Sequence, residues 1–529
     1  METTIQVFNV GAVGVISDIP AHTLPPEAWS DAYGMRMSKR GARTARGRKQ
    51  VFGTPNFAPG FIYYVPAGAD TFWVYANLTK AAVYDNGVHS DLTRVSGDYT
   101  ATELWQWNAC NLGGIPIFNN GADIPQFWAT ISSGTKLANL TNWPSNLRAK
   151  VVRTFGRWLV ALNITEDSVN FPHVVRWSHE AEPGEVPSSW DPTDPTVDAG
   201  QLQLTDVEGG NIMDGLMLGN AFVVYKQTST HIIRFSGGSN FFSPDLLFAS
   251  SGILATGCVC AIAKGVKHFV VTEDDVIIHS GTKDVISVAD DKVRERIFSD
   301  IDPENRDRCF VVNNEKRSEV SFCYCSSGAV HPNRQAVYNY VKDTWTFLHF
   351  VGTSAAQGLV TGSDTTTWNG NLTDLWDEDG SDKPWSDNEG RGIVVADFEN
   401  GVLRQLDTGN TWDPASAGHF VERRAQAMVG RDRQGQPKVD YRVNKLVHRV
   451  WPKITGLGQV NVYVGAQEDF DTEVVWSDPM LFDPSVNKYV DVYPPVNTKL
   501  PAFKFEAVDS NVPWQLEGYD VDMSLVGNL

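Results

Sequence analysis

Short runs of β-forming residues, each ended by a turn sequence, set the strongest limit on what this chain can fold into. In GVKHFVVTEDDVIIHSG, residues 265–281, Val266, His268 and Val270 alternate with the residues between them. Residues 272–275 form a polar turn, and a second apolar run follows. Successive side chains of a strand point to opposite faces, so this pattern predicts a hairpin. Similar pairs of runs occur at residues 71–93, 156–165, 219–237, 317–350 and 391–409.

Glycines open several of these runs at similar intervals. Gly156, Gly219 and Gly265 lie roughly 45 to 65 residues apart, which fits a propeller blade of four short strands. The spacing varies and no Trp-Asp signature accompanies it, so a bent sandwich with long insertions is the alternative. The interval between the glycines matches the length of one blade. It therefore favours a mainly β fold with a β-propeller-like body built of short antiparallel blades.

The composition of the sequence changes near residue 410, where a polar, glycine-containing stretch begins that is typical of a domain boundary or an extended segment. The segment beyond it contains several strand-like runs in quick succession, which predicts an additional C-terminal β-sandwich-like domain. We therefore expect an N-terminal extended, basic segment packing on the body (residues 1–57), the propeller-like body (58–410) and a β-rich C-terminal domain (411–529). The best short helical candidate is KVRERIFSDI, residues 292–301.

No residue pattern identifies an active site or a bound metal. The six cysteines include two C-x-C pairs in alternating apolar runs, which predicts buried or half-buried free thiols rather than half of a zinc site. They are Cys110, Cys258, Cys260, Cys309, Cys323 and Cys325. G-x-S-x-G, H-E-x-x-H, Walker and G-x-G-x-x-G motifs are missing, and the histidines lack metal-ligand spacing. We expect no catalytic residue, no cofactor and no metal.

Two turn sequences match known motifs only in part. Residues 377–382, DEDGSD, do not follow the order of ligands in an EF-hand loop. We therefore predict a solvated acidic turn, and a weakly bound calcium ion is the alternative. Residues 363–370 and 377–385 match the Asp-box of sialidase propellers only in part, and an Asp-Gly turn before a strand is common hairpin chemistry.

Targeting signals are weak. No window is apolar over the eighteen or so residues that a membrane-spanning helix needs, so we expect no membrane span. The first residues lack the basic region and apolar core of a secretory signal, so cytoplasmic synthesis is expected. The sequons at Asn77, Asn139, Asn163 and Asn371 would matter only in a eukaryotic secretory pathway.

The charge is unevenly distributed. The chain has 63 acidic and 44 basic residues and a formal net charge of −19. Seven of the fifteen residues from 36 to 50 are nevertheless Lys or Arg, and none is acidic. They are Arg36, Lys39, Arg40, Arg43, Arg46, Arg48 and Lys49. An acidic protein holds DNA poorly through its phosphates but lets it pass without adhering.

The stretch before and through this basic run resembles a known family. Tail nozzle (tail tubular) proteins of short-tailed bacteriophages often carry an L-P-x-x-A-W-x-D segment, a short strand and a basic, glycine-containing stretch. Leu24, Pro25, Ala28, Trp29 and Asp31 stand at those positions here. The order of later elements is also similar, at residues 265–281, 285–302, 317–327, 334–347, 450–467 and 513–527.

The resemblance implies a structural virion protein of the phage tail. In that family a propeller-based subunit forms a homohexameric ring below the portal and adaptor rings. The genome leaves through this ring without specific binding, and fibres or spikes attach around it. We predict that Leu24, Pro25 and Trp29 anchor the N-terminal segment. The seven basic residues are interpreted as an inter-subunit or adaptor contact, with a solvated turn and direct DNA contact as alternatives.

A carbohydrate-binding or glycoside-cleaving propeller that acts on cell-surface polysaccharide is the alternative function. It is motivated by the 17 Trp residues, whose faces stack on sugars. A nucleic-acid-binding arm, resting on residues 36–49 alone, is a third hypothesis.

Overall fold

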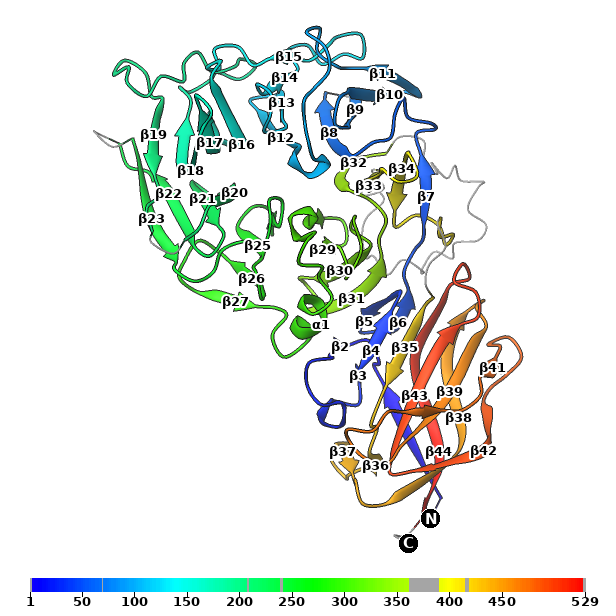
Figure 1. Ribbon diagram of the computed structural model, residues 1–529. Coiled ribbons are helices and arrows are strands. Elements are labelled where there is room, and N and C mark those ends of the chain that lie inside the picture. The colour runs from blue at the N-terminus through cyan, green and yellow to red at the C-terminus, as the bar shows by residue number, and fades with distance from the viewer. Residues whose placement is uncertain are drawn as a thin grey trace.

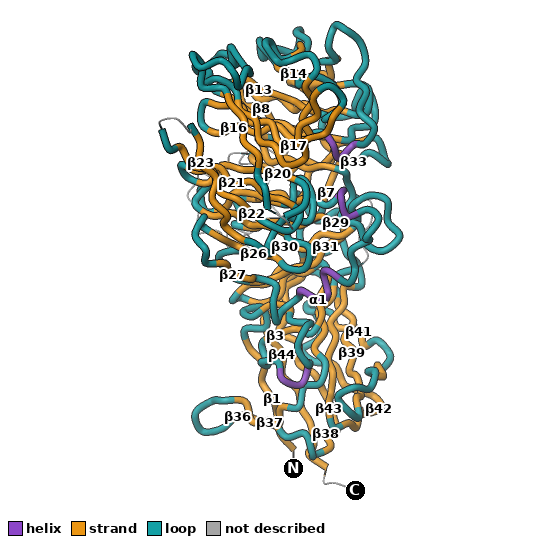
Figure 2. Tube along the Cα trace, turned by 60° about the vertical axis from the view of Figure 1, so that its left-hand side comes forward, coloured by secondary structure: helices purple, strands orange, loops and turns teal. Residues whose placement is uncertain are grey.

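The protein consists of a β-propeller and a β-sandwich that lie end to end (Figures 1 and 2). The computed structural model describes residues 2–68, 70–206, 209–237, 241–360, 390–413 and 418–526. Both described ends of the chain lie at the end of the sandwich remote from the propeller, as Figure 1 shows. The mainly β fold class predicted from the alternating runs is confirmed.

The propeller contains seven four-stranded antiparallel sheets among the described residues, arranged around a centre. Blades 1 to 3 are β8–β11, β12–β15 and β16–β19. Blades 4 to 6 are β20–β23, β24–β27 and β28–β31, and blade 7 is β32–β34 with β7. The strand bounds of blades 1 to 3 are β8 Phe61–Ala67, β9 Asp70–Ala76, β10 Ala81–Asp85, β11 Val88–Asp91, β12 Asn108–Leu112, β13 Ile115–Asn119, β14 Gln126–Phe127, β15 Ala138–Asn139, β16 Leu147–Phe155, β17 Trp158–Glu166, β18 Val169–Trp177 and β19 Gly200–Gln203. Those of blades 4 to 7 are β20 Ile212–Leu218, β21 Ala221–Lys226, β22 Thr230–Phe235, β23 Phe242–Phe248, β24 Val259–Ile262, β25 Lys267–Val271, β26 Val276–His279, β27 Val285–Ser287, β28 Phe310–Asn314, β29 Glu319–Tyr324, β30 Arg334–Asn339, β31 Thr344–His349, β32 Ser354–Leu359, β33 Arg391–Asp397, β34 Val402–Leu406 and β7 Arg48–Val51.

The recurring glycines occupy the same place in three successive blades. Gly156, Gly219 and Gly265 each lie in the tight turn between the first and second strands, with φ of +59°, +59° and +81°. Glycine adopts this left-handed backbone without the Cβ clash of other residues. The hairpin predicted for residues 265–281 is β25 and β26, closed by a hydrogen bond from Thr272 N to Asp275 O of 2.9 Å.

Blade 7 is completed by the N-terminal part of the chain. Its first three strands come from residues 354–406, and β7 pairs antiparallel with β34, placing Gln50 opposite Arg404. A propeller that joins two distant segments of the chain in one sheet closes its ring with backbone hydrogen bonds.

The sandwich is built from both ends of the chain. One sheet has the strand order β42-β38-β44-β6-β5, with β1 also on β44, and the other has the order β4-β35-β43-β39-β40, with β41 also on β39. Their bounds are β1 Glu2–Phe8, β4 Asp31–Tyr33, β5 Met35–Ser38, β6 Gly41–Thr44, β35 Phe420–Arg423, β38 Asn444–Gly456, β39 Val460–Gln467, β40 Val475–Trp476, β41 Met480–Phe482, β42 Val490–Thr498, β43 Leu500–Ala507 and β44 Trp514–Val526. Two small two-stranded pairs accompany these sheets: β2 Gly14–Val15 with β3 Ala28–Trp29, and β36 Met428–Arg431 with β37 Pro437–Val439.

This pairing corrects the expected N-terminal unit of residues 1–57. The segment does not simply pack on the body, because β1, β4, β5 and β6 belong to the sandwich and β7 belongs to blade 7. The expected 411–529 domain accordingly takes strands from the other end of the chain. A strand's sequence gives its propensity and face but not its partner, and these partners lie hundreds of positions away.

The helical content of the described residues is small. The helix expected within residues 292–301 is α1, Arg294–Phe298, and three single 3₁₀ turns are η1 Ala21–Thr23, η2 Leu104–Gln106 and η3 Arg306–Arg308. Within the described ranges no helix is long and apolar enough to cross a membrane. Five of the six cysteines are buried free thiols and Cys260 is half-buried, as predicted.

Candidate functional site at the junction of the two domains

The segment that carries the family resemblance lies where the sandwich meets the propeller. Trp29 is buried at the end of β3, its ring centroid 6.3 Å from those of Phe505 and Tyr519, and its indole N–H donates to the carbonyl of Val10. Leu24 is buried too. Leu24 and Trp29 are thus both buried, as side chains that anchor the segment would be, and their anchoring role stays a prediction.

Pro25 departs from that prediction. It is exposed, so it contributes no buried side chain. The backbone beside it is fixed instead by a residue from the other end of the chain. Buried Arg423 donates from Nη2 to Leu24 O over 2.9 Å.

The first half of the basic run forms the β5–β6 hairpin at the edge of one sandwich sheet. Alternation along β5 turns Met35 and Met37 into the core, while Arg36 points the other way. Arg36 reaches the propeller, where Nη2 lies 3.0 Å from Glu319 Oε2 and 2.9 Å from Asp407 Oδ2. Its second amino group also pairs with Asp407. The two carboxylates come from blades 6 and 7, so one guanidinium ties the sandwich to two blades.

The electrostatics of this cluster favour its charged form. Burial by itself would lower the pKa of Arg36, but the charges of Asp407 and Glu319 outweigh it and raise that pKa. Burial would likewise raise the pKa of Asp407, whereas Arg36 and Arg317 hold it below its usual value. Each charged group is therefore compensated by its neighbours.

Arg48 is buried within the propeller at the start of β7. Its Nη1 donates to His349 O over 3.0 Å, and its Nη2 lies 2.8 Å from His349 Nδ1. Its guanidinium also lies over the ring of Trp412, 5.4 Å from the centroid. Burial, together with the nearby charge of Arg404, lowers the pKa of Arg48 to about 10. Arg48 therefore holds the closing strand in place.

These positions divide the seven basic residues into groups. Arg36 and Arg48 make contacts inside the chain, and this corrects their assignment to an inter-subunit or adaptor contact. The strands that carry them direct their side chains inward. Their positive charge alone does not predict that direction. Arg43, Arg46 and Lys49 are half-buried. Lys39 and Arg40 are exposed at the tip of the β5–β6 hairpin, and for them an intermolecular contact stays a prediction.

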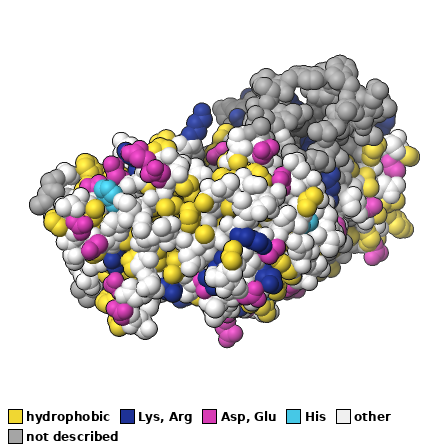
Figure 3. Space-filling model, turned by 90° about the horizontal axis from the view of Figure 1, so that it is seen from above, with side chains coloured by type: hydrophobic (Ala, Val, Ile, Leu, Met, Phe, Trp, Pro, Cys, Tyr) yellow, Lys and Arg dark blue, Asp and Glu magenta, His cyan; other side chains and the backbone are white. Residues whose placement is uncertain are grey.

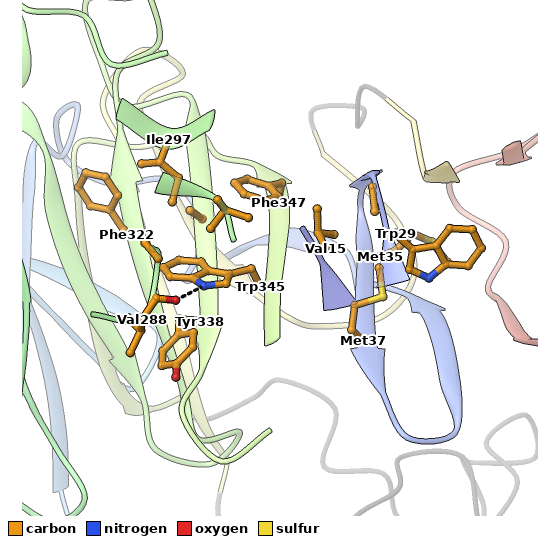
Figure 4. Close-up of a cluster of buried hydrophobic side chains, with 14 of the residues drawn as sticks. Val15, Trp29, Met35, Met37, Val288, Ile297, Phe322, Tyr338, Trp345 and Phe347 are labelled. Atoms are coloured by element: carbon orange, nitrogen blue, oxygen red, sulfur yellow. Dashed lines mark hydrogen bonds between the residues drawn. The ribbon is translucent and has the colours of Figure 1, made fainter. Parts of the chain in front are cut away.

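The junction also has an apolar part (Figure 4). Val15, Trp29, Met35 and Met37 belong to the same continuous cluster of buried side chains as residues of blades 4 to 6. The propeller side chains labelled in Figure 4 are Val288, Ile297, Phe322, Tyr338, Trp345 and Phe347. Because one core runs through both domains, relative motion would expose apolar surface.

Polar contacts border this apolar part. Gly34 N donates to Phe347 O over 2.8 Å. Arg296 of α1 pairs with Asp31 over 2.7 Å and lies 3.8 Å above the ring of Phe347. Sequence analysis did not identify three of these contact residues, Glu319, Asp407 and Arg296. The sequence shows only that each carries a charge opposite to that of a residue far away in the chain.

Among the described residues no group of three or more His, Cys, Asp or Glu side chains is placed to hold a metal ion. Residues 363–370 and 377–385, including the acidic turn 377–382, lie outside the described residues.

Comparison with known proteins finds distant similarity to solved structures, without a match to a family model or to a curated sequence. The chain is similar to PorZ of Porphyromonas gingivalis, a surface component of the type-IX secretion system, with a TM-score of 0.32 and 8% identity over 58% of this chain and 35% of PorZ. It is also similar to the N-terminal domain of Nup159, with a TM-score of 0.37 and 10% identity over 69% of this chain and 95% of that one. The similarity to Citrobacter koseri AztD has a TM-score of 0.29 and 11% identity over 56% of this chain and 74% of AztD.

Proposed function

We propose that this protein is a structural subunit of a phage tail nozzle. It would form a homohexameric ring below an adaptor, through which the genome is ejected and around which fibres or spikes attach. The proposal rests on the resemblance at residues 24–53 and on the order of the later elements. The observation that carries it is that this same stretch fixes the two domains to each other.

A stiff junction suits a subunit of a tube wall. Arg36 joins the sandwich to Glu319 and Asp407 of two blades, and Trp29 lies in a core that is continuous through both domains. A ring that passes pressurised DNA must keep its bore constant, which a hinged subunit would not do. Breaking such a buried ion pair leaves uncompensated charge, so the two domains resist separation.

The charge distribution is compatible with a conduit. The net charge of −19 disfavours adhesion of DNA. On the propeller edge that Figure 3 shows, acidic and basic side chains are interspersed with hydrophobic ones. The exposed Lys39 and Arg40 form a compact basic tip on an acidic molecule, which fits an acidic surface of a neighbouring subunit or ring. A closed ring needs two different surfaces that meet head to tail.

The test is assembly with the adaptor ring from the same virus, followed by negative-stain imaging and native mass spectrometry. We expect a six-fold ring on the adaptor. The double variant Lys39→Glu/Arg40→Glu should weaken its formation, whereas Lys283→Glu, an exposed lysine of the propeller, should not. A chain that stays monomeric with the adaptor, and that antibodies do not detect in purified virions, would refute the proposal.

A second candidate function, binding of a cell-surface polysaccharide, is favoured by one cavity of the propeller, described below. The residues that line that cavity include no Asp or Glu. It therefore lacks the pair of carboxylates with which most glycosidases cleave, and binding is the better candidate there.

A further inference from the structure

The propeller has a polar cavity of about 340 Å³ in its inner part. Its residues come from η2 and the loop before it, from the first three strands of blade 3, and from loops of blade 2 and before blade 5. They are Thr102, Trp105, Gln106, Gly121, Ala122, Ala149, Lys150, Asn163, Thr165, Asn170 and Thr256. We call it the Trp105–Lys150 cavity. Its volume is suited to one or two sugar units rather than to a protein segment.

Lys150 is the only charged residue in that lining, and within the described parts of the chain it has no ion-pair partner. Its Nζ lies 3.5 Å from Met213 Sδ and 6.0 Å from the ring centroid of Trp105. Burial lowers the pKa of Lys150, and Asp307 and Asp214 act against this. Asp214, however, pairs with Arg153 over 2.9 Å and accepts a hydrogen bond from Gly257 N. The cavity therefore offers a positive charge that none of its own lining residues neutralises, and Asp307 is the remaining carboxylate whose charge acts on it.

Trp105 supplies an aromatic surface beside this charge. It is half-exposed, whereas Trp107 of the same segment is buried and donates its indole N–H to Asn77 O. A Trp ring left partly open inside a cavity provides a flat apolar face, and its indole N–H provides a donor. Such a face packs well against the C–H groups of a pyranose ring.

The remaining polar side chains are held in place by the protein. Asn163 donates to Ile212 O over 3.0 Å and accepts from Asn170 over 3.0 Å, and Thr256 donates to Met213 O over 2.9 Å. The Thr165 hydroxyl accepts from Asn170, so its own proton is available to a ligand. Asn163 has φ +52° at a register shift between Leu162 and Ile164, an irregularity that re-aims a side chain. Such non-glycine positions cluster at binding sites because the surrounding structure must hold them.

We propose that the Trp105–Lys150 cavity binds a carboxylate-bearing sugar unit of an acidic polysaccharide. The carboxylate pairs with Lys150 Nζ and a pyranose face packs on Trp105. Ring hydroxyls bond to Gln106, Thr165 and Thr256. This site goes beyond the proposed tail role and does not depend on ring assembly, since all of its residues come from one chain.

The experiment is a binding titration of the full chain by calorimetry and tryptophan fluorescence. The probes are tri-galacturonate, an oligo-glucuronate and sialyllactose. Lactose and carboxyl-reduced tri-galacturonate serve as neutral controls. At least one acidic probe should bind about tenfold or more tightly than its neutral counterpart, since a charge-assisted hydrogen bond contributes that much. Lys150→Met should abolish this difference and Lys150→Arg should retain most of it. Trp105→Ala should weaken binding of the acidic and neutral probes together.

Controls separate the site from a general effect on the fold. Trp476→Ala, a half-buried tryptophan of the sandwich, should leave binding unchanged, and circular dichroism should confirm that every variant is folded. The proposal is overturned if no acidic probe binds, if acidic and neutral probes bind equally, or if acetate alone competes as well as the oligosaccharide. It is also overturned if Lys150→Met binds like the unaltered chain. None of these outcomes bears on whether the chain forms a ring with an adaptor.

Discussion

Arg36 of the sandwich and Asp407 of the propeller form a two-pronged ion pair, with 2.9 Å between Arg36 Nη2 and Asp407 Oδ2. Their side chains are only 15% and 17% exposed, and Glu319, 10% exposed, shares the same guanidinium. The two paired residues lie 371 positions apart in the sequence. The contact therefore joins two segments that are far apart in the sequence across the junction of the two domains.

Replacing Arg36 by Met should destabilise this junction strongly. It would leave two nearly buried carboxylates without their shared partner, although Arg317 still lies 3.5 Å from Asp407. Breaking a buried pair in this way costs about 3–5 kcal/mol. Urea unfolding followed by circular dichroism measures the loss. Arg40→Met removes an exposed charge of the same hairpin and should stay within about 0.5 kcal/mol of the unaltered chain. Equal stability of the two variants would mean that Arg36 does not join the domains.

The anchor residue Trp29 offers a second test, this time of packing. Trp29→Ala should lower the free energy of unfolding by about 3–5 kcal/mol, because it leaves a cavity next to Phe505 and Tyr519 and orphans the carbonyl of Val10. Trp29→Phe should cost less, since most of the ring volume is retained. Pro25→Ala, at an exposed position of the same segment, should change thermal unfolding little.

Gly34 should resist substitution for two separate reasons. Its φ is +70°, and a Cβ there would collide with the buried ring of His419. Gly34→Ala should therefore cost about 1–3 kcal/mol from overpacking in addition to backbone strain. Gly87→Ala is the matched control, since Gly87 also has a positive φ of +90° but open space around it. If both variants lose the same stability, the His419 contact is irrelevant and strain explains everything.

Acid should weaken the propeller through a buried histidine pair. Tyr225 Oη lies 2.7 Å from His268 Nδ1 and 2.8 Å from His279 Nε2, and both imidazoles are buried between blades 4 and 5. Burial lowers the pKa of His268 from 6.5 to about 4. Burial, with the nearby His268, lowers that of His279 to about 3. The unfolded chain then binds more protons than the folded one between pH 6.5 and about 4, so stability falls as the pH falls through this range.

The measurement is the free energy of unfolding of the propeller as a function of pH. Each histidine contributes a slope of about 1.4 kcal/mol per pH unit below its unfolded pKa. His279→Gln should reduce the slope by about that amount. Tyr225→Phe should lower stability but retain most of the slope, because the phenol does not titrate there. An unchanged slope in His279→Gln would contradict the assignment.

Much of the propeller was predictable because its blades are built from local pairs. Gly156, Gly219 and Gly265 marked the first turn of three successive blades, since only a tight turn with positive φ requires glycine there. Alternation was a poorer guide. His268, Phe269 and Val270 are all fully buried, because a central blade strand is covered on both faces.

The candidate sites were less accessible to such reasoning. Leu24, Pro25 and Trp29 could be named as anchors because they stand at the positions of the L-P-x-x-A-W-x-D segment, although Pro25 is exposed. The partners of Arg36 could not be named from the sequence. Glu319 and Asp407 become its neighbours only when the strand of residues 35–38 joins a sheet beside blades 6 and 7. The Trp105–Lys150 cavity was missed for the same reason: Lys150, Trp105 and Thr256 belong to three separate segments.

The sequence by itself thus determined the strands, their turns and the propeller-plus-sandwich class, since these depend on residue propensity and on contacts within one blade. Only the tertiary structure decided that both ends of the chain build the sandwich, that β7 closes blade 7, and which basic side chains are buried. Those outcomes depend on backbone and charge pairings between distant segments. The free energy of such a pairing depends on the apolar surface that the partner buries and on the charge that it neutralises. It therefore cannot be inferred from either residue of the pair alone.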